Sequence, residues 1–580
     1  MLLTRSLLVL CLSLSAFSSQ AEQSREDREP EAATGFTQKK AFVADNYMVA
    51  TANPFASWAG KNVLRKGGSA IDAAIAAQAM LTLVEPQSSG IGGGSFILYW
   101  DNKKKELITF DGRETAPSNA NGYLFMKNGK PMAWRDAVVG GNSVGVPGTL
   151  RALEMAHSEY GKLAWKALFE DPEKIAKNGF EVSDRLAKLV NMNFHPGLTE
   201  FAATKNYFYP GGNAVEKGYL RKNPALAKVF SAIANEGADV FYEGEIAKNI
   251  AKTVQNAPIN PGLLTAEDIK QYQAIKRQPV CGSYREYKVC GMPPPSSGGI
   301  NVVQILKMLE GFELSQYKPN SATALHLFTQ SSRLAYADRE MYIADSDFTH
   351  LPFAALINPT YLKRRSEYIT PEKDMRKARA GKPYAEAFIE QGLAYELPNT
   401  SHLVIVDAEG NAVSMTSSIE FAFGSGLMVD GFLLNNQLTD FSLNPMKGNY
   451  QVLNRIEPRK RPRSAMSPTM VFNKEGELIL ALGSPGGSRI VSYVAQTLVG
   501  VLDWNLDIQQ SINLPKVTNR NDYTALEKGT AAENLKPLFE KWGHNVKIID
   551  LNSGLHGIQI KNGKLIGGAD PRREGVAVGE

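Results

Sequence analysis

Short apolar runs rich in β-branched residues dominate the last third of the chain. Residues 403–407 form one such run, the turn-forming stretch 408–411 follows, and residues 412–416 form a second run. This pattern predicts a β-hairpin. In the first part of the chain, the apolar runs 96–100 and 107–110 flank a polar, lysine-rich turn and predict another hairpin.

Helical patterns are strongest in the first two-thirds of the chain. Ser69 is placed to cap an alanine-rich helix over residues 70–83, which has to stop before Pro86. Further helices are predicted over residues 150–157 and 322–339. Helices and strands in these proportions, without an internal repeat, predict an α/β (α+β) protein.

The amino terminus has the pattern of a secretory signal peptide over residues 1–21. It contains one basic residue, Arg5, then an apolar core and a small-residue ending at Ala21. Residues 22–40 are polar and charged and predict a flexible lead-in. We therefore expect a periplasmic or secreted protein with no membrane attachment after signal removal, because no other stretch approaches the roughly 20 apolar residues of a membrane span.

Composition narrows the classes of function. A content of 43% hydrophobic and 21% charged residues is normal for a globular protein. The net charge of +5, from 64 basic and 59 acidic residues, is too balanced to predict nucleic-acid binding. The seven histidines are scattered without metal-ligand spacing, so we expect neither a metal nor another cofactor.

Removal of the signal peptide leaves Cys281 and Cys290 as the only cysteines. If Arg285 and Glu286 form a two-residue turn, the cysteines face each other across a hairpin. In an exported protein this arrangement favours a disulfide. The spacing does not fit a redox or zinc CxxC motif.

Two glycine-rich segments carry candidate chemistry. Residues 88–95 lead into a predicted strand, whereas a phosphate-binding loop would need a helix there. Residues 483–488 join a predicted strand, 477–482, to an apolar helix, 490–502. This second segment is either an ordinary strand-to-helix turn or a site where glycine amides stabilise a developing negative charge.

A Thr-Ser-His step opens the hairpin of the last third of the chain. Thr400 is its first residue and directly follows Asn399. One interpretation is structural, because threonine is a good strand former and its hydroxyl often bonds a loop amide. The other is chemical: Thr400 is a candidate nucleophile that becomes available only if the chain is cut before it.

Nine short stretches, taken together, resemble the γ-glutamyltranspeptidase family of N-terminal-nucleophile hydrolases. Each stretch is a weak signal alone, but the set occurs in the family's order over nearly the whole mature length. The stretches are residues 86–94, 110–114, 292–299, 335–339, 399–402, 434–437, 440–442, 466–469 and 483–489.

The resemblance implies a four-layer αββα sandwich and a precursor that cleaves itself. The Thr400 hydroxyl would attack the carbonyl of Asn399. The products would be a large subunit, 41–399, and a small subunit, 400–580, which remain associated as a heterodimer in one intertwined domain, 41–580. The new α-amine of Thr400, with an ordinary pKa of about 7.7–8.0, would then serve as the base for its own hydroxyl.

The same resemblance implies roles for residues far apart in the sequence. Ser418 would support the nucleophile, and Gly486 and Gly487 would donate backbone N–H groups to the oxyanion. Contacts to a γ-glutamyl substrate are implied for Arg113 and Ser464 at the α-carboxylate, and for Glu420, Gln437 and Asp440 at the α-ammonium.

Three features depart from the family pattern. Glu420 stands where an asparagine is common, and Ala465 replaces a second serine beside Ser464. The connection over residues 441–464 is short, with Tyr450 as the one candidate for a lid tyrosine. These departures predict an open pocket with a reduced carboxylate clamp.

We therefore predict an exported γ-glutamyltransferase and hydrolase acting on glutathione and related compounds. It would pass the γ-glutamyl group from a threonine ester to water, an amino acid or a peptide. A related amidohydrolase of glutaryl-type acylase specificity is the first alternative. A non-catalytic exported binding protein is the second, and the intact Asn399–Thr400 step argues against it because a binding protein does not need that step.

Overall fold

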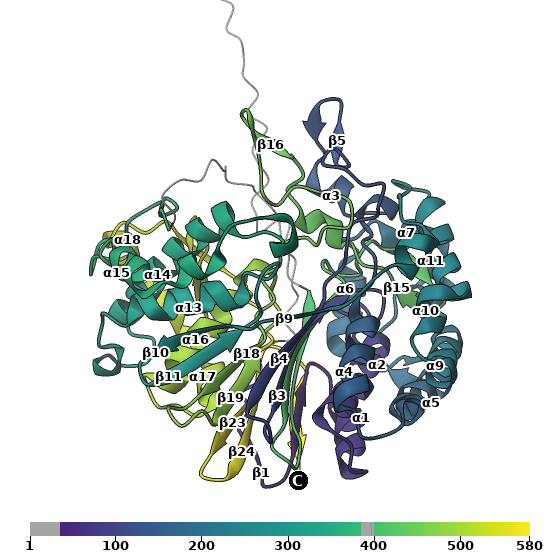
Figure 1. Ribbon diagram of the computed structural model, residues 1–580, viewed down its shortest axis with the longest axis horizontal. Coiled ribbons are helices and arrows are strands. Elements are labelled where there is room, and N and C mark those ends of the chain that lie inside the picture. The colour runs from purple at the N-terminus through teal and green to yellow at the C-terminus, as the bar shows by residue number, and fades with distance from the viewer. Residues whose placement is uncertain (1–34, 384–395, 397–398) are drawn as a thin grey trace, which may run out of the picture.

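The computed structural model describes residues 35–383, 396 and 399–580 (Figure 1). The predicted signal peptide, residues 1–21, lies outside the described residues. In the part of the chain that is described, no helix combines the length and the apolar character needed to cross a bilayer.

The last residues of the predicted lead-in are anchored rather than flexible. The ammonium group of Lys39 donates hydrogen bonds to the carbonyl oxygens of Asp570, Arg573 and Gly575 at 2.6–2.8 Å. The amide of Thr37 also donates to a carbonyl oxygen in this carboxy-terminal loop. Polar sequence alone predicted flexibility here, but three backbone acceptors bind the lysine ammonium and fix the segment.

Within the described residues, the first of two seven-stranded sheets combines strands from both sides of residue 400. Its order is β25-β2-β12-β13-β3-β4-β9, and all its pairs are antiparallel. In that order the strands are Val576–Gly579, Met48–Thr51, Thr400–Val406, Ala412–Ser418, Gly94–Asp101, Glu106–Gly112 and Ile275–Arg277. The strand that begins with Thr400 therefore lies inside the sheet, between β2 and β13.

The second sheet has the order β1-β24-β23-β19-β18-β11-β10 and is also antiparallel. In that order its strands are Phe42–Ala44, Lys564–Ala569, His556–Lys561, Leu478–Gly483, Thr469–Phe472, Tyr287–Gly291 and Val280–Tyr284. Both sheets draw strands from before and after residue 400, so a cut there would leave one shared core.

Helices cover the outer face of each sheet, which gives four layers (Figure 1). On the first sheet lie α1, α2 and α4, with α5 and α9 outside them: Pro54–Arg65, Ala70–Val84, Thr149–Tyr160, Glu170–Asn178 and Pro224–Glu236. On the second sheet lie α13, α16 and α17, with α14 and α15 outside α13: Gly298–Leu309, Ile490–Leu502, Ile508–Asn513, Ala322–Tyr342 and Pro359–Ser366. This arrangement confirms the predicted αββα sandwich.

Strand β12 shows why both sheets are buried on both faces. Leu403 and Ile405 belong to the core between the first sheet and its helices. Val404 and Val406 belong to the core that includes the space between the two sheets. Successive side chains point to opposite faces of a strand, so an unbroken apolar run suits a strand in the middle of a sandwich.

Local sequence signals account for the predicted elements. The hairpin of β12 and β13 is confirmed, and so is the hairpin of β3 and β4. Ser69 caps α2: its Oγ accepts from the amide of Asp72 at 3.2 Å, and the Asp72 carboxylate accepts from the Ser69 amide at 2.9 Å. This reciprocal pair is a capping box, which fixes the start of the helix.

The cysteine hairpin has the expected register. Cys281 in β10 pairs with Cys290 in β11, and Tyr284 pairs with Tyr287, which leaves Arg285 and Glu286 as a two-residue turn. A disulfide joins the two cysteines. Because β10 is an edge strand of the second sheet, this link covalently secures that edge.

Candidate active site

Thr400 lies at an open corner of the first sheet. Strand β2 pairs with residues 403–406 of β12 and does not extend to Thr400. On the other side, Thr400 is in register with Ser418, the last residue of β13. Thr400 is nevertheless only 2% exposed, so its hydroxyl is held among protein groups rather than in water.

The hydroxyl of Ser418 connects the Thr400 side chain to the peptide bond before it. Thr400 Oγ1 donates to Ser418 Oγ at 3.2 Å, and Ser418 Oγ donates to the carbonyl oxygen of Asn399 at 3.1 Å. The amide of Glu420 donates to the same Ser418 oxygen at 2.8 Å and fixes its position. Ser418 thus holds both the Thr400 hydroxyl and the adjacent carbonyl group in position.

Two buried arginines hold the chain on either side of the Asn399–Thr400 bond. Arg185 Nη2 donates to the side-chain oxygen of Asn399 at 2.9 Å. Arg573 Nη1 donates to the carbonyl oxygen of Thr400 at 3.3 Å. Sequence reasoning missed both residues, because neither lies in a recognisable motif and only the fold brings them to this bond.

The other two residues of the Thr-Ser-His step do not form a catalytic pair with Thr400. Ser401 is the next residue on the strand, so its side chain points to the opposite face. His402 is fully buried, and its Nδ1 lies 2.9 Å from Thr416 Oγ1. Burial holds the pKa of His402 well below its ordinary value, so the ring is neutral and serves as a core residue.

Four of the predicted substrate residues form one buried network. Arg113 directly follows β4, and Gln437 and Asp440 lie three residues apart in one 3₁₀ turn. Arg113 Nη2 and Gln437 Nε2 both donate to Asp440 Oδ2, and Gln437 Nε2 also donates to Glu420 Oε2 at 3.1 Å. Glu420 has a φ of 76°, a conformation that non-glycine residues seldom adopt outside functional sites and turns.

The charges of this network match an α-amino acid head group. Burial raises the pKa of Glu114 to about 8, although the neighbouring Arg113 opposes the shift, so Glu114 is mostly neutral at pH 7. One guanidinium then faces the two carboxyl groups of Asp440 and Glu420. Arg113 Nη1 makes no hydrogen bond among the described residues, and its ion-pair contact is Glu114 Oε2 at 3.5 Å. The site therefore offers acceptors to an ammonium and an N–H donor to a carboxylate.

A small cavity connects this network to Thr400. Its volume is about 10 Å³, which is room for roughly one water molecule. The fold brings together at this cavity the predicted residues Arg113, Thr400, Ser418, Glu420, Gln437, Asp440, Ser464 and Gly487. Ser464 Oγ accepts from the amide of Met466 at 3.1 Å, so its own hydrogen remains able to donate.

The glycine turn between β19 and α16 places one of its two glycines at the cavity. Gly486 and Gly487 have φ values of 132° and 53°, which favour glycine. A Cβ at Gly486 would lie 2.6 Å from a ring carbon of Tyr493. Gly487 lines the cavity beside Thr400 and Gly486 does not. The oxyanion role of the pair stays a prediction, and the geometry favours Gly487.

The prediction of an open pocket is wrong for the uncut chain. Glu396, which sequence reasoning did not single out, lines the cavity beside Thr400 and is 3% exposed. Tyr450, the candidate lid residue, lies in β17, Tyr450–Gln451, is 50% exposed and does not line the cavity. The Glu396 side chain therefore occupies space that the sequence suggested was open.

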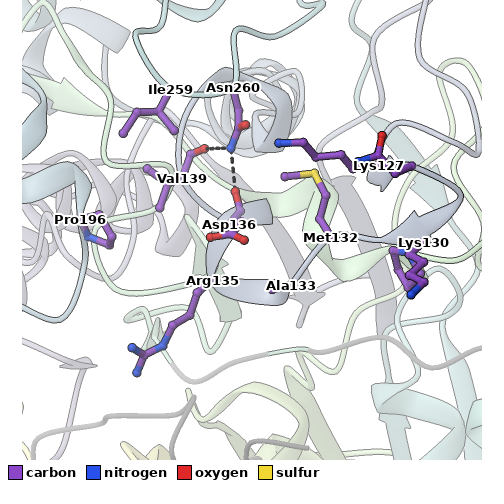
Figure 2. A pocket seen from close by; sticks show the side chains of 12 residues that line it. Lys127, Lys130, Met132, Ala133, Arg135, Asp136, Val139, Pro196, Ile259 and Asn260 are labelled. Atoms are coloured by element: carbon purple, nitrogen blue, oxygen red, sulfur yellow. Dashed lines mark hydrogen bonds between the residues drawn. The ribbon is translucent and has the colours of Figure 1, made fainter. Parts of the chain in front are cut away.

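A wider pocket of about 820 Å³ lies elsewhere (Figure 2). Asn260 closes one side of it by donating to the carbonyl oxygens of Asp136 and Val139. Its lining includes Lys127 and Arg135 but no serine, threonine, cysteine or histidine. Among the residues that the structure describes, no group of three or more His, Cys, Asp or Glu side chains is arranged to hold a metal ion. The small cavity at Thr400 is the candidate active site because it brings Thr400 together with the predicted substrate residues.

Comparison with known proteins identifies the family. The family model for gamma-glutamyltranspeptidase matches residues 56–580. The chain is 37% identical to the glutathione hydrolase proenzyme of Bacillus subtilis (strain 168) over 555 residues, which cover 93% of this chain and 92% of that protein. It is also 37% identical to the glutathione hydrolase proenzyme of Escherichia coli (strain K12) over 536 residues, 90% of each.

A solved structure supports the same relationship at the level of the fold. The cephalosporin acylase from Bacillus halodurans superposes with a TM-score of 0.83 at 27% identity, and the match covers 95% of this chain and 98% of the acylase. Thr400 and the buried network of Arg113, Glu420, Gln437 and Asp440 lie within residues 56–580, the part that the family model matches. The chain therefore belongs to the gamma-glutamyltranspeptidase family of N-terminal-nucleophile hydrolases.

Proposed function

We propose that this protein is an autoprocessed γ-glutamyltransferase and glutathione hydrolase. The observation that carries the proposal is one cavity that joins the Thr400 hydroxyl to a site for an α-amino acid head group. A γ-glutamyl amide has such a head group two methylenes away from the carbonyl to be attacked. The relatives named glutathione hydrolase proenzyme support the same assignment.

Maturation would begin with attack of Thr400 Oγ1 on the carbonyl of Asn399. The hydroxyl proton leaves, the C–O bond forms, and the amide C–N bond breaks to give an ester and a free amine. Water then hydrolyses the ester and releases the Asn399 carboxylate. The resulting subunits would be 41–399 and 400–580, and the shared sheets would keep them together as a heterodimer.

Turnover would use the same hydroxyl with a new base. The free α-amine of Thr400 takes the hydroxyl proton as Oγ1 attacks the γ-glutamyl carbonyl. The Gly487 amide would stabilise the oxyanion, and the departing amine takes the proton. The acyl group then passes from the threonine ester to water or to the amino group of an amino acid or peptide.

Ser418 should be required for rapid maturation. Ser418→Ala removes the hydroxyl that contacts both Thr400 Oγ1 and the Asn399 carbonyl, so we expect cleavage to slow by roughly 10- to 100-fold. Ser418→Thr keeps that hydroxyl and should restore the rate. Ser417→Ala is the matched control, because Ser417 Oγ bonds to Gln78 on the opposite face. Equal cleavage rates for Ser418→Ala and wild type in time-resolved denaturing gels would remove Ser418 from the mechanism.

A pair of anilides separates this proposal from a glutaryl-type acylase. The fold similarity to a cephalosporin acylase makes that activity the second candidate. We expect kcat/KM for γ-glutamyl-4-nitroanilide to exceed that for glutaryl-4-nitroanilide by about 100-fold or more, because the second compound leaves Glu420 and Asp440 without an ammonium. Faster cleavage of the glutaryl compound would assign the protein to the acylases instead.

Export completes the proposal. The predicted signal peptide over residues 1–21 would direct the precursor to the periplasm or the medium. The disulfide between Cys281 and Cys290 suits such an oxidising compartment.

A further inference from the structure

Two further buried arginines contact Glu396. The proposed function assigns no role to these arginines. Arg339 lies in α14 and Arg463 directly precedes Ser464; both side chains are 1% exposed. Arg339 Nη2 and Arg463 Nε both contact the same carboxylate oxygen, Glu396 Oε1, the latter at 3.4 Å. Ser297 Oγ, which accepts from Arg339 Nε at 2.9 Å, completes the group. We call Arg339, Arg463 and Ser297 the second clamp.

The positive charges of the second clamp are neutralised only while Glu396 is present. Among the residues that the structure describes, one other carboxylate contacts both guanidinium groups: Glu340 accepts from Arg339 Nη1 at 2.8 Å and from Arg463 Nη2 at 2.9 Å. Two buried cations thus share two anions. Departure of Glu396 would leave one excess positive charge in a desolvated place, which is costly unless another anion replaces it.

Glu396 occupies the second clamp in the uncut chain and is placed to leave it after cleavage. It precedes Thr400 by four residues, on the side of the chain that cleavage after Asn399 would free. It lines the cavity together with Thr400 and Arg113, and the remaining volume of about 10 Å³ cannot hold a γ-glutamyl group. A substrate can enter only if Glu396 leaves. Its Oε2 has no hydrogen-bond partner among the described residues, so the clamp holds it through one oxygen.

We propose that, after cleavage, the second clamp binds a second carboxylate of the substrate, in the place that Glu396 holds in the uncut chain. The inference rests on the proposed function, because it requires cleavage at Asn399–Thr400. Arg113 would hold the α-carboxylate of the γ-glutamyl group. The second clamp would hold a carboxylate on the other side of the scissile amide, in donors with an acidic leaving group or in peptide acceptors with a free carboxyl terminus.

Two chromogenic donors test the donor half of this inference in the mature wild-type enzyme. We expect kcat/KM for γ-glutamyl-3-carboxy-4-nitroanilide to exceed that for γ-glutamyl-4-nitroanilide by about tenfold or more. In Arg463→Met this ratio should fall to about 1, mainly through KM. In Arg364→Met, a control at an exposed arginine of α15, the ratio should stay at the wild-type value.

Two acceptors test the other half, first in the wild-type enzyme and then in Arg463→Lys. Transfer from γ-glutamyl-4-nitroanilide to glycylglycine should be about tenfold more efficient than transfer to glycylglycine amide, which lacks the carboxylate. If the wild-type enzyme prefers the carboxylate-bearing compound in either assay and Arg463→Lys retains part of that preference, the second clamp is supported. The assay that shows the preference identifies whether donor or acceptor uses the clamp. Ratios near 1 in both wild-type assays would overturn the inference while leaving γ-glutamyl transfer intact. Absence of cleavage of both donors would overturn the proposed function and the inference together.

Discussion

Thr400→Ala is expected to yield a single uncut chain without amidase activity. The substitution removes Thr400 Oγ1, the atom that we propose attacks the Asn399 carbonyl and that donates to Ser418. Alanine fits the strand, so the fold should not change. Loss of a nucleophile typically lowers kcat by a factor on the order of 10⁶. We therefore expect a fall of at least about 10⁴-fold in γ-glutamyl-4-nitroanilide hydrolysis.

The neighbouring residue provides the control for this loss. Ser401→Ala changes a hydroxyl one position away on the opposite face of β12 and should give a cleaved, active enzyme. Thr400→Ser keeps a hydroxyl and should retain cleavage at a reduced rate. Substantial hydrolysis by uncut Thr400→Ala would place the nucleophile elsewhere.

Arg113→Met should affect both catalysis and stability. Arg113 is fully buried and pairs with Asp440, so its removal leaves an unpaired buried carboxylate at a cost of about 3–5 kcal/mol. The same change removes the proposed partner of the substrate α-carboxylate. We expect kcat/KM for γ-glutamyl-4-nitroanilide to fall by roughly 10²- to 10³-fold, and thermal unfolding to shift to lower temperature.

Two variants separate these effects. Arg113→Lys keeps the charge but loses the planar fork, so it should recover stability more fully than kcat/KM. Arg364→Met, at an exposed site, should change neither quantity. If Arg113→Met loses stability yet keeps wild-type kcat/KM at a temperature where it is folded, Arg113 is a structural residue only.

Local patterns predicted the elements that hold the active site. The apolar runs of β12 and β13 and the capped helix α2 have strong short-range signals, and the structure has them with slightly longer bounds. Within the predicted lead-in, 22–40, the sequence did not indicate that Lys39 is bound, because its partners are carbonyl oxygens more than 500 positions away. A contact of that kind leaves no periodic pattern in the sequence.

Some residues of the candidate site could likewise be predicted from the sequence, and others could not. Residues in recognisable motifs, such as Arg113 and Asp440, could be named in advance, and the fold brings them to one cavity. Arg185 binds the scissile segment across 214 positions and stands in no motif, so only the fold reveals it. Arg339 does stand in a motif, but its role depends on Glu396, whose side chain reaches it across 57 positions. Sequence reasoning could not place that carboxylate in the cavity.

The most direct test of the central claim is the intact mass and amino-terminal sequence of the purified wild-type protein under denaturing conditions. We expect two chains, the smaller of which begins with Thr-Ser-His at residue 400 and ends at residue 580, whereas Thr400→Ala gives one chain. An active wild-type protein that remains a single chain, or one cut at any other bond, would contradict it.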